Sequence, residues 1–537
     1  MQDDVATSTS MLLALAALLV CWALLYGFHP LARWKWRKIP GPPPKWYAGN
    51  LMEMMRESSY HYYIRNARKY GKVIKVWFGA TPVIVVTDPD LGRAINLRNP
   101  NRHSTVGPVT VMPPKERIFD NEGILLTKDR AYHRSLRNAW QPAFFSESLN
   151  GYANLMNGGA DRLIKRLGKA AAKKQEVNIW RMLGDLTMDV VGTASFGVEF
   201  KTQVDEDEDP SSSKESRELV MSAQTIFQMG GAGGSLYVPI VVLCPALLPL
   251  VRMIAGAFPD ARMKKLIRAR TKLQETCASL LQQARERKES AAKSTGSKPE
   301  RGLAPGSFME HMAEAKHHAN VKNGSPFSDI EIIQQAFGFL LAGYETTASA
   351  LAFTIYNLSA NPDKAAKLIQ EVDAFGRDRL PQNNDLEKLP YVQAVFKEAL
   401  RLFPPGHISI REAVEDLNLD GFMVEKGTWI HVSLCGIHRD PDVWSKPDEF
   451  VPERWIPGAP EEATEAQKKA WMPFGDGIRA CVGKRFAWEE ALIALLRIYQ
   501  RFDFKLSPGQ VPLEVRSPFT LGPAKGIFVT PVLRMEE

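Results

Sequence analysis

A segment near the carboxyl end of the chain, FGDGIRACVG at positions 474–483, combines residue types that could carry chemistry. It places Cys481 directly before a run with a helical pattern over 484–500. At the N-terminus of a helix, the dipole and the unpaired N–H groups favour a thiolate over a thiol. A cysteine taken alone is more simply a small buried apolar residue. It is the spacing of the whole loop that predicts a thiolate with a ligand.

The other residues of this loop suit a flat, acidic ligand. Gly475 and Gly477 allow a tight turn and let the main chain lie close to a plane. Arg479 offers a fork of N–H donors that matches a carboxylate. Gly483 leaves no side chain between the helix and the group on the sulfur. An axial thiolate on haem iron pushes electron density onto the metal and favours O–O cleavage, which is one chemistry that a thiolate in such a loop could support.

A second polar group lies on a helix that is predicted to cross the core. The pattern over 329–360 predicts a long helix, which begins with a capping box of Ser328 and Glu331. Its centre, 336–343, is apolar on nearly every face, which is typical of a helix buried through a core. Glu345 follows that run, with two threonines after it. A carboxylate at such a place is costly unless it is used or paired.

The cysteine loop resembles the haem-binding pattern of cytochromes P450 at every defined position. The resemblance continues in the expected order along essentially the whole chain after Ile39. It implies a cytochrome P450 fold, mainly α with a small β-rich subdomain, and haem b as cofactor, with O2 and NADPH as cosubstrates. The matching positions are Phe474, Gly477, Arg479, Cys481 and Gly483, with Cys481 as the iron ligand and Phe474, Arg479 and Gly483 against the haem.

The same resemblance assigns a structural network outside the loop. Glu398 and Arg401, in KEALRLFPP, are similar to the family's buried Glu-x-x-Arg pair, and their spacing puts both on one helix face. Arg454, in PERW, resembles the third member of that network. Such a pair read alone would mean little, because surface helices produce it often. The role implied here is assembly of the core and the haem pocket.

Further positions resemble those that hold the haem propionates. Arg411 lies where the family places a basic residue that binds a haem propionate. Arg137, in HRSLRNAWQPAF, matches a second such residue on an earlier helix. One turn before Arg137 the wider family often has tryptophan, whereas this chain has His133 with Tyr132 beside it. Either of these two could contact a propionate, and His133 could instead be an exposed helix histidine.

The sequence AGYETT at 342–347 resembles the family's oxygen-binding motif. Glu345 and Thr346 would form an acid–alcohol pair that relays protons to oxygen. This implies a monooxygenase that inserts one oxygen atom into a lipophilic small molecule, with electrons from NADPH–cytochrome P450 reductase. One alternative is a haem-thiolate isomerase or dehydratase that needs no reductase, although such relatives often lack the intact pair. Another is a non-enzymatic membrane protein that binds haem and a lipophilic ligand.

The N-terminal region predicts a membrane anchor. Residues 11–28 form an uncharged run that would span about 27 Å as a helix, close to the thickness of a bilayer's hydrocarbon core. Acidic residues precede it, which disfavours a cleavable signal peptide. Trp34 and Trp36 suit the membrane interface, and the basic flank at 33–38 places the remainder in the cytosol. We expect a single-pass protein of the endoplasmic reticulum membrane, with a plastid membrane as the alternative.

Composition and charge then set the domain plan. We expect residues 1–38 to form the tail, anchor and basic flank, 39–45 a proline-rich hinge, and 46–537 the catalytic domain. The formal net charge is +8, but the cations are spread among acidic residues, so we expect no nucleic-acid partner. Strands are predicted over 73–78 and 83–87, and solvated loops over 205–213 and 286–305.

The substrate is predicted less directly. The stretches SFGVEF, ALAFTIYNLSANPDKAAKLIQEVDAFG and LDGFMVEKGTWI resemble the plant and algal branch that contains the carlactone oxidases, which favours an apocarotenoid or another terpenoid. The branch with animal drug-metabolising and thromboxane-synthesising enzymes shares AGYETT, and sterols, fatty acids and phenolics remain open. The segments predicted to line the pocket are largely apolar, with His407 and Ser409 as polar contacts; they are 106–118, 227–238, the middle of the oxygen helix, 404–410 and 517–521.

Overall fold

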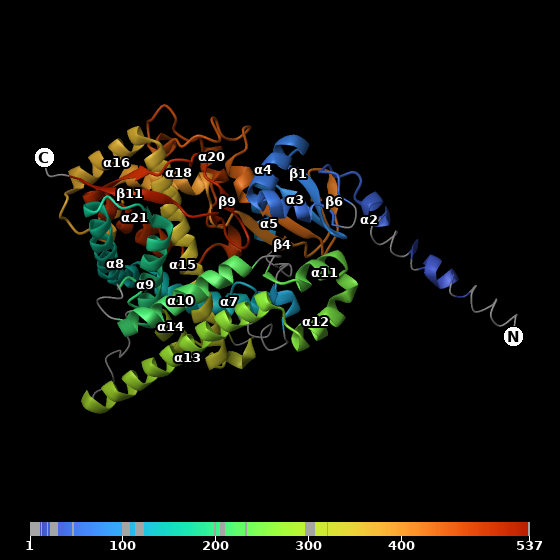
Figure 1. The fold of residues 1–537 in the computed structure, drawn as a ribbon, viewed down its shortest axis with the longest axis horizontal. Coiled ribbons are helices and arrows are strands. Elements are labelled where there is room, and N and C mark those ends of the chain that lie inside the picture. Colours follow the sequence, from blue (N-terminus) through green and yellow to red (C-terminus); the bar gives the residue numbers. More distant parts are fainter. Residues whose placement is uncertain are drawn as a thin grey trace.

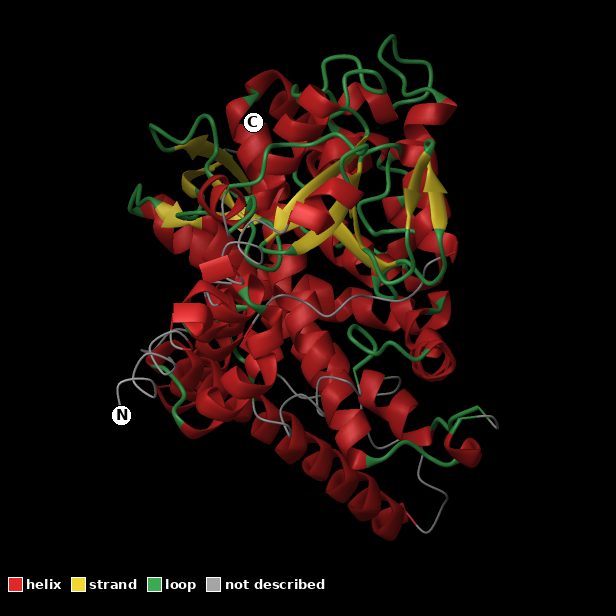
Figure 2. Ribbon diagram, turned by 90° about the vertical axis from the view of Figure 1, so that its right-hand side faces the viewer, coloured by secondary structure: helices red, strands yellow, loops and turns green. Residues whose placement is uncertain are grey.

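The computed structural model builds the chain mainly from helices, with the strands gathered in one half of the molecule (Figure 1, Figure 2). This agrees with the predicted mainly α fold with a small β-rich part. The residues that the structure describes are 11, 13–18, 20–21, 30–45, 48–98, 108–112, 123–197, 200–204, 210–230, 234–295, 307–318 and 321–534.

The helices differ widely in length, and the longest, α13 and α15, run along and through the helical half. The α-helices are α2 (Pro30–Lys35), α3 (Leu51–Glu57), α4 (Ser59–Tyr70), α5 (Pro89–Arg98), α7 (Arg130–Trp140), α8 (Ser146–Ala172), α9 (Ile179–Phe196), α10 (Pro210–Met229), α11 (Tyr237–Leu243), α12 (Leu248–Ala257), α13 (Ala261–Thr295), α14 (Phe308–Glu314), α15 (Asp329–Ala360), α16 (Pro362–Phe375), α17 (Asn383–Leu386), α18 (Pro390–Leu402), α19 (Leu434–His438), α20 (Glu465–Ala470) and α21 (Lys484–Arg501). Short 3-10 turns are η1 (Pro108–Val111), η2 (Gln141–Phe144), η4 (Pro245–Leu247), η5 (Lys322–Gly324), η6 (Pro452–Trp455) and η7 (Gly477–Arg479).

The strands form small sheets around one mixed sheet in the order β1-β2-β7-β4. In this sheet β2 pairs with β7 in parallel, and the other two pairings are antiparallel. The remaining sheets are β3-β11-β8, β9-β10 and β5-β6. The strands are β1 (Val73–Phe78), β2 (Thr81–Val86), β3 (Val177–Asn178), β4 (Ile408–Glu412), β5 (Leu417–Leu419), β6 (Phe422–Val424), β7 (Trp429–Ser433), β8 (Phe502–Leu506), β9 (Val515–Arg516), β10 (Gly522–Pro523) and β11 (Phe528–Leu533).

Several predicted elements are confirmed. The helix expected over 329–360 is α15, and its capping box of Ser328 and Glu331 is present. The first predicted strand is β1, and the second, expected over 83–87, begins and ends slightly earlier as β2. The helix after the cysteine loop is α21. These segments share strong local signals, namely a cap, β-branched runs between glycines, or a long apolar period.

Both predicted acidic or mixed-charge loops are partly wrong. Helix α10 begins at Pro210, inside the expected loop over 205–213, and 205–209 lie outside the described residues. Helix α13 continues to Thr295, inside the loop expected over 286–305, of which 296–305 are not described. The first turn at Pro210 suits proline, and the charged stretch before 296 contains good helix formers with no glycine or proline. Charge alone therefore did not mark a loop.

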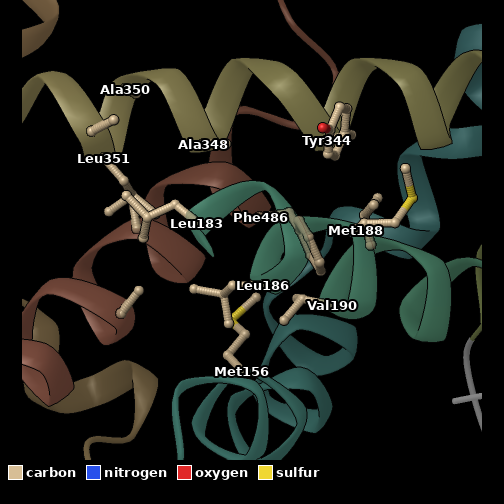
Figure 3. Packing of buried hydrophobic residues seen from close by; sticks show 14 of the residues in the cluster. Met156, Leu183, Leu186, Met188, Val190, Tyr344, Ala348, Ala350, Leu351 and Phe486 are labelled. Atoms are coloured by element: carbon tan, nitrogen blue, oxygen red, sulfur yellow. The ribbon is translucent and has the colours of Figure 1, made fainter. Parts of the chain in front are cut away.

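Helices α15 and α9 pack closely, and this packing forms the centre of the core. Side chains of α9, α8, α15 and α21 gather in one cluster there (Figure 3). A Cβ added at Gly343 of α15 would lie 2.5 Å from Val191 Cγ2, and one at Gly184 of α9 would lie 3.1 Å from the ring of Tyr344. Small residues at these two positions are what allow the helices to approach.

Most of the predicted anchor over 11–28 cannot be compared with the structure, which describes only residues 11, 13–18, 20 and 21 of it. No helix within the described part of the chain is both long and apolar enough to cross a membrane. In the basic flank, Trp34 is exposed, whereas Trp36 is buried with Ile39 in the cluster beneath the mixed sheet. The interfacial role predicted for Trp36 is therefore wrong, because its ring packs into the catalytic body.

The predicted proline-rich hinge is non-helical over 39–45, as expected, but it is held against the sheet. Lys75 N donates to Pro40 O at 2.8 Å, and Lys75 Nζ donates to Trp36 O at 2.7 Å. The close approach requires glycine at position 41, where a Cβ would lie 2.1 Å from Lys75 O. The hinge thus fixes where residues before 36 leave the body.

Candidate functional site

The cysteine loop is held by its own main chain. Cys481 N donates to Phe474 O at 2.9 Å, and Ala480 N donates to Gly477 O at 3.0 Å. Gly475 and Gly477 have φ values of 70° and 73°, which favour glycine. A Cβ at Gly477 would lie 2.9 Å from Asn96 O, so this glycine allows the loop to approach α5. The tight loop that the sequence predicted is present, although Gly477 makes room for protein.

Cys481 lies where a ligand on its sulfur could be reached. The residue is exposed, while burial among the surrounding protein raises the pKa of its thiol. The Gly483 N–H and the charges of Arg137 and Lys484 act in the opposite direction and do not outweigh burial. In the structure without a ligand, burial therefore has a larger effect on the pKa of this thiol than the favourable charges around it. A coordinating metal deprotonates a thiol, so a haem iron bound to the sulfur would favour the thiolate.

The middle of α15 also carries accessible surface inside the fold. Ala342 is exposed although Leu340 and Tyr344 beside it are buried. Ala342 and Cys481 are thus both accessible to a ligand. Gly343, the next residue, packs against Val191 of α9. Of these two small residues, Ala342 is the exposed one and Gly343 serves helix packing.

Three arginines and one histidine gather beside the loop. The pKa of His133 is lowered to about 3, first by burial and then by the charges of Arg479, Arg137 and Arg411. Arg137 donates to Ala480 O at 2.7 Å, Arg479 to Thr127 O at 2.7 Å, and Arg411 to Ile410 O at 2.9 Å. Two propionates would supply negative charge that suits this cluster. The residues present thus fit a haem.

The structure separates the two candidates on the first part of α7. His133 is buried near the three arginines, which excludes the reading as an exposed helix histidine. Tyr132 instead donates its hydroxyl to Glu331 Oε1 at 2.8 Å, at the cap of α15. Of the two residues, His133 is the one placed on the side of the arginines.

Glu398, Arg401 and Arg454 form one buried ion network. Arg401 donates to both carboxylate oxygens of Glu398, at 2.9 and 2.8 Å, and Arg454 Nε donates to Oε1 at 3.3 Å. The amide of Val451 and the indole of Trp455 also donate to this carboxylate, each at 3.0 Å. The network binds α18 to η6, which lies on the chain path toward the cysteine loop.

The acid–alcohol pair on α15 has two different environments. Thr346 Oγ1 donates to Ala342 O at 2.5 Å, along the same helix. Glu345 is buried; burial raises its pKa to about 7, while Arg516, Arg181 and a hydrogen bond from Thr520 lower it. Thr520 Oγ1 lies 3.4 Å from Glu345 Oε1 and Arg516 Nη2 lies 3.9 Å from it. The carboxyl group therefore titrates near neutral pH.

Sequence reasoning missed Arg516, and it placed Thr520 in the pocket-lining segment 517–521 without its contact to Glu345. Both residues lie about 170 residues beyond Glu345, in β9 and in the loop before β10, with no local motif that links them to it. Conversely, His407 and Ser409, expected as polar contacts to a substrate, are buried and engaged with protein. His407 Nε2 lies 2.7 Å from Ser59 Oγ, and Ser409 Oγ donates to Asn96 Oδ1 at 2.8 Å.

Comparison with known proteins places this geometry in a family. A model of the family described as cytochrome P450 matches residues 39–530. Among curated proteins the chain is similar to cytochrome P450 3A5 of Homo sapiens, with 28% identity over 98% of this chain and 97% of the relative. It is 29% identical to cytochrome P450 3A14 of Cavia porcellus, over 96% and 95%. Cytochrome P450 3A6 of Oryctolagus cuniculus is also 29% identical, over 99% and 98%.

The ion network generates a first prediction. Glu398→Gln leaves two buried guanidinium groups without their shared anion, and breaking a buried pair in this way costs ~3–5 kcal/mol. We expect expressed protein of this variant to retain haem in a much smaller fraction, measured as haem absorbance per protein. Glu387→Gln, which removes a charge at an exposed position near α18, is the control and should load haem normally. Normal haem content in Glu398→Gln would contradict the assembly role.

Proposed function

The chain belongs to the cytochrome P450 family, and from this premise we propose that it oxidises a lipophilic small molecule, a terpenoid or apocarotenoid, with electrons from NADPH–cytochrome P450 reductase. Membership makes it a haem-dependent monooxygenase, which uses haem b with O2 and NADPH-derived electrons supplied through a reductase. The observation that carries the proposal is the acid–alcohol pair on a buried helix, beside accessible surface at Ala342.

The haem would be held by residues from several elements. Cys481 would ligate the iron, Phe474 and Gly483 would lie against the ring, and Arg137, Arg411, Arg479 and His133 would bind the propionates. When bound, the haem supplies a metal on which O2 is reduced and cleaved. Neutral His133 would donate one N–H to a carboxylate, and each arginine would donate a charged fork.

The chain's own part in the reaction is proton delivery. The Thr346 hydroxyl donates its proton to the Ala342 carbonyl, so the lone pairs of its oxygen remain available to accept a hydrogen bond from a proton donor. Glu345, with a pKa of about 7, can hold or release a proton at neutral pH, which is what a general acid requires. An isomerase or dehydratase would not need this pair, so its presence favours the monooxygenase. Turnover that requires the reductase would distinguish the two.

Thr346→Ala tests the role of the alcohol. We expect NADPH consumption to continue while product per NADPH falls roughly 10²-fold or more, the usual range for a lost proton-transfer group, with hydrogen peroxide formed in its place. Thr346→Ser should restore most of the coupling. Thr354→Ala is a matched control, since Thr354 makes the same bond to the carbonyl four residues earlier but is fully buried. Tight coupling in Thr346→Ala would refute the relay.

The apolar character of the pocket-lining segments supports the substrate class. Phe227 on α10 lies 6.0 Å from Phe519 and 6.3 Å from Tyr344, measured between ring centroids. Val111 and Met112, in the described part of the segment 106–118, are also apolar and buried. Aromatic and aliphatic surface of this kind suits a polyene or terpene chain, and His407 and Ser409 are already engaged elsewhere.

Titration of the haem-loaded protein with lipophilic compounds tests the substrate class. We expect carlactone, as an apocarotenoid, to give a saturable shift in haem absorbance, and cholesterol and lauric acid to give none at comparable concentration. A shift with cholesterol or lauric acid alone would move the assignment to sterols or fatty acids. Because the haem reports the binding, this result does not depend on finding the right reductase.

We also propose that residues 11–28 anchor the protein in the endoplasmic reticulum membrane, with the catalytic domain in the cytosol. Support comes from the exposed apolar side chains of the described part of that run, such as Leu13 and Leu18. A second apolar surface lies on α11, η4 and α12, toward the same end of the molecule as α2 (Figure 1). Its exposed residues are Ile240, Leu247, Leu250, Met253, Ile254 and Phe258.

Flotation with phosphatidylcholine vesicles tests the anchor. We expect the full chain to float with the vesicles in high salt, because apolar burial is insensitive to ionic screening. Deletion of residues 1–29 should leave only weak association through the surface on α11 and α12. A full chain that remains at the bottom of the gradient would contradict the anchor.

A further inference from the structure

A hollow of about 250 Å³ lies near Glu345, because Arg516, one of its lining residues, is 3.9 Å from the Glu345 carboxyl group. It is lined by Trp180 and Arg181 at the start of α9, Gln228 at the end of α10, Arg516 of β9, and Ala524 and Lys525 after β10. Pockets for drug-sized ligands are roughly 300–1,000 Å³, so this one suits a smaller guest. Its lining is cationic, with three basic side chains and no acidic one.

Two of these cations face the hollow without hydrogen-bonded anions. Within the part of the chain that the structure describes, no hydrogen bond is made by the guanidinium of Arg181 or of Arg516. The charge nearest to Arg516 is Glu345, at 3.9 Å, which is beyond hydrogen-bonding distance. Lys525 differs from them, because its Nζ forms an ion pair with Glu514 Oε2 at 2.9 Å. The N–H donors of two guanidinium groups are therefore available to a ligand at one small site.

Trp180 fixes both forks in place. The Arg181 guanidinium carbon lies 4.3 Å from the Trp180 ring centroid, and that of Arg516 lies 5.5 Å from it. The indole itself is buried and donates to Ser349 Oγ at 3.0 Å, so the ring is tied to α15. Cation–π contacts of this kind hold a guanidinium while leaving its N–H donors available. The site is thus preorganised rather than a chance meeting of flexible side chains.

The wall between this hollow and Glu345 is thin. A Cβ added at Gly522 would lie 3.3 Å from Trp180 Cζ2 and 3.8 Å from Glu345 Oε1. Arg516 spans the wall, since its guanidinium lines the hollow and also lies within 3.9 Å of the carboxyl group. A charge placed in the hollow would therefore act on Glu345 through Arg516.

We propose that this hollow binds a small oxyanion, a phosphate or carboxylate group, between Arg181 and Arg516, and that the bound anion regulates proton delivery by Glu345. Planar guanidinium forks match such oxygens in two-point contact. The regulatory part rests on the proposed function, because it assumes that Glu345 relays protons. The binding part stands on the cationic hollow alone.

The direction of the effect follows from the charges around Glu345. Arg516 from β9 and Arg181 from α9 lower its pKa, as does the hydrogen bond from Thr520. Its neighbour Tyr344 is hydrogen-bonded to Gln224 of α10, and the carboxyl group of Asp185 on α9 acts on both Tyr344 and Arg181. An anion between the arginines offsets their positive charge, so Glu345 keeps its proton to higher pH. The alkaline limb of coupled turnover should then move upward.

Binding is measured first, by isothermal titration of inorganic phosphate into the haem-loaded protein in phosphate-free buffer. We expect saturable binding at one site, weakened roughly tenfold or more in Arg181→Gln and in Arg516→Gln, since each variant loses charge-assisted hydrogen bonds. Arg268→Gln, an exposed arginine on α13, is the matched control and should bind as the parent does. Arg516→Lys keeps the charge without the fork and should be intermediate; haem absorbance verifies that each variant is folded.

Glycerol 3-phosphate and acetate identify the source of the anion. Tighter binding of glycerol 3-phosphate than of phosphate assigns a phosphate carried by a larger molecule, and tighter binding of acetate assigns a carboxylate. If none of the three binds, or if all bind Arg181→Gln and Arg516→Gln as tightly as the parent, the site is refuted.

Regulation is measured as product per NADPH across pH 6 to 9, with and without phosphate. We expect phosphate to move the alkaline limb to higher pH in the parent and to leave it unchanged in Arg516→Gln. An unmoved limb in a parent that binds phosphate would refute regulation. If Glu345→Gln couples as well as the parent at every pH while phosphate still binds, it is the relay in the proposed function that fails, and the anion site remains.

Discussion

The carboxylate of Glu398 is the interaction on which the catalytic half of the molecule depends. It lies fully buried and accepts hydrogen bonds from two guanidinium groups, one main-chain amide and one indole. Taking such a set of charges out of water is costly, and their mutual attraction compensates only when the geometry is complete. Arg401 completes it by donating to the carbonyls of His438, Pro447 and Glu449. Chain segments that are far apart in sequence are thereby fixed around one buried anion.

From this anion, a row of tryptophans leads toward the cysteine loop. Trp455, which donates to Glu398, lies 5.5 Å from Trp471, and Trp471 lies 6.4 Å from Trp488 on α21. The cysteine loop lies between Trp471 and α21, so its two ends are set by rigid aromatic packing. This support matters for the proposed iron ligand, because burial raises the pKa of the Cys481 thiol and a bound metal would have to offset that effect. Precise placement of the sulfur would favour such binding.

Helix α15 meets a different demand, since it must be apolar enough to cross the core and yet carry polar groups at its centre. Each polar side chain at the centre of α15 has its own partner. Thr346 bonds along its own helix, while Glu345 is met by Thr520 and Arg516 from the C-terminal β-region. The cost of the buried carboxyl is seen in its raised pKa, and that same cost gives it a pKa near the working pH. An anion bound in the arginine-lined hollow near Glu345 would be well placed to change that pKa.

The sequence by itself determined the features that depend on local order. The tight turn of the glycine-rich cysteine loop, the cap and length of α15, and strand β1 all follow from neighbouring residues. Tertiary structure decided what depends on distant partners. Gly343 packs against Val191 of α9, Trp36 enters the core, and Arg516 reaches Glu345 from β9. It also decided the thiol's pKa, because desolvation depends on the whole surrounding fold, whereas a helix terminus can be read from a few residues.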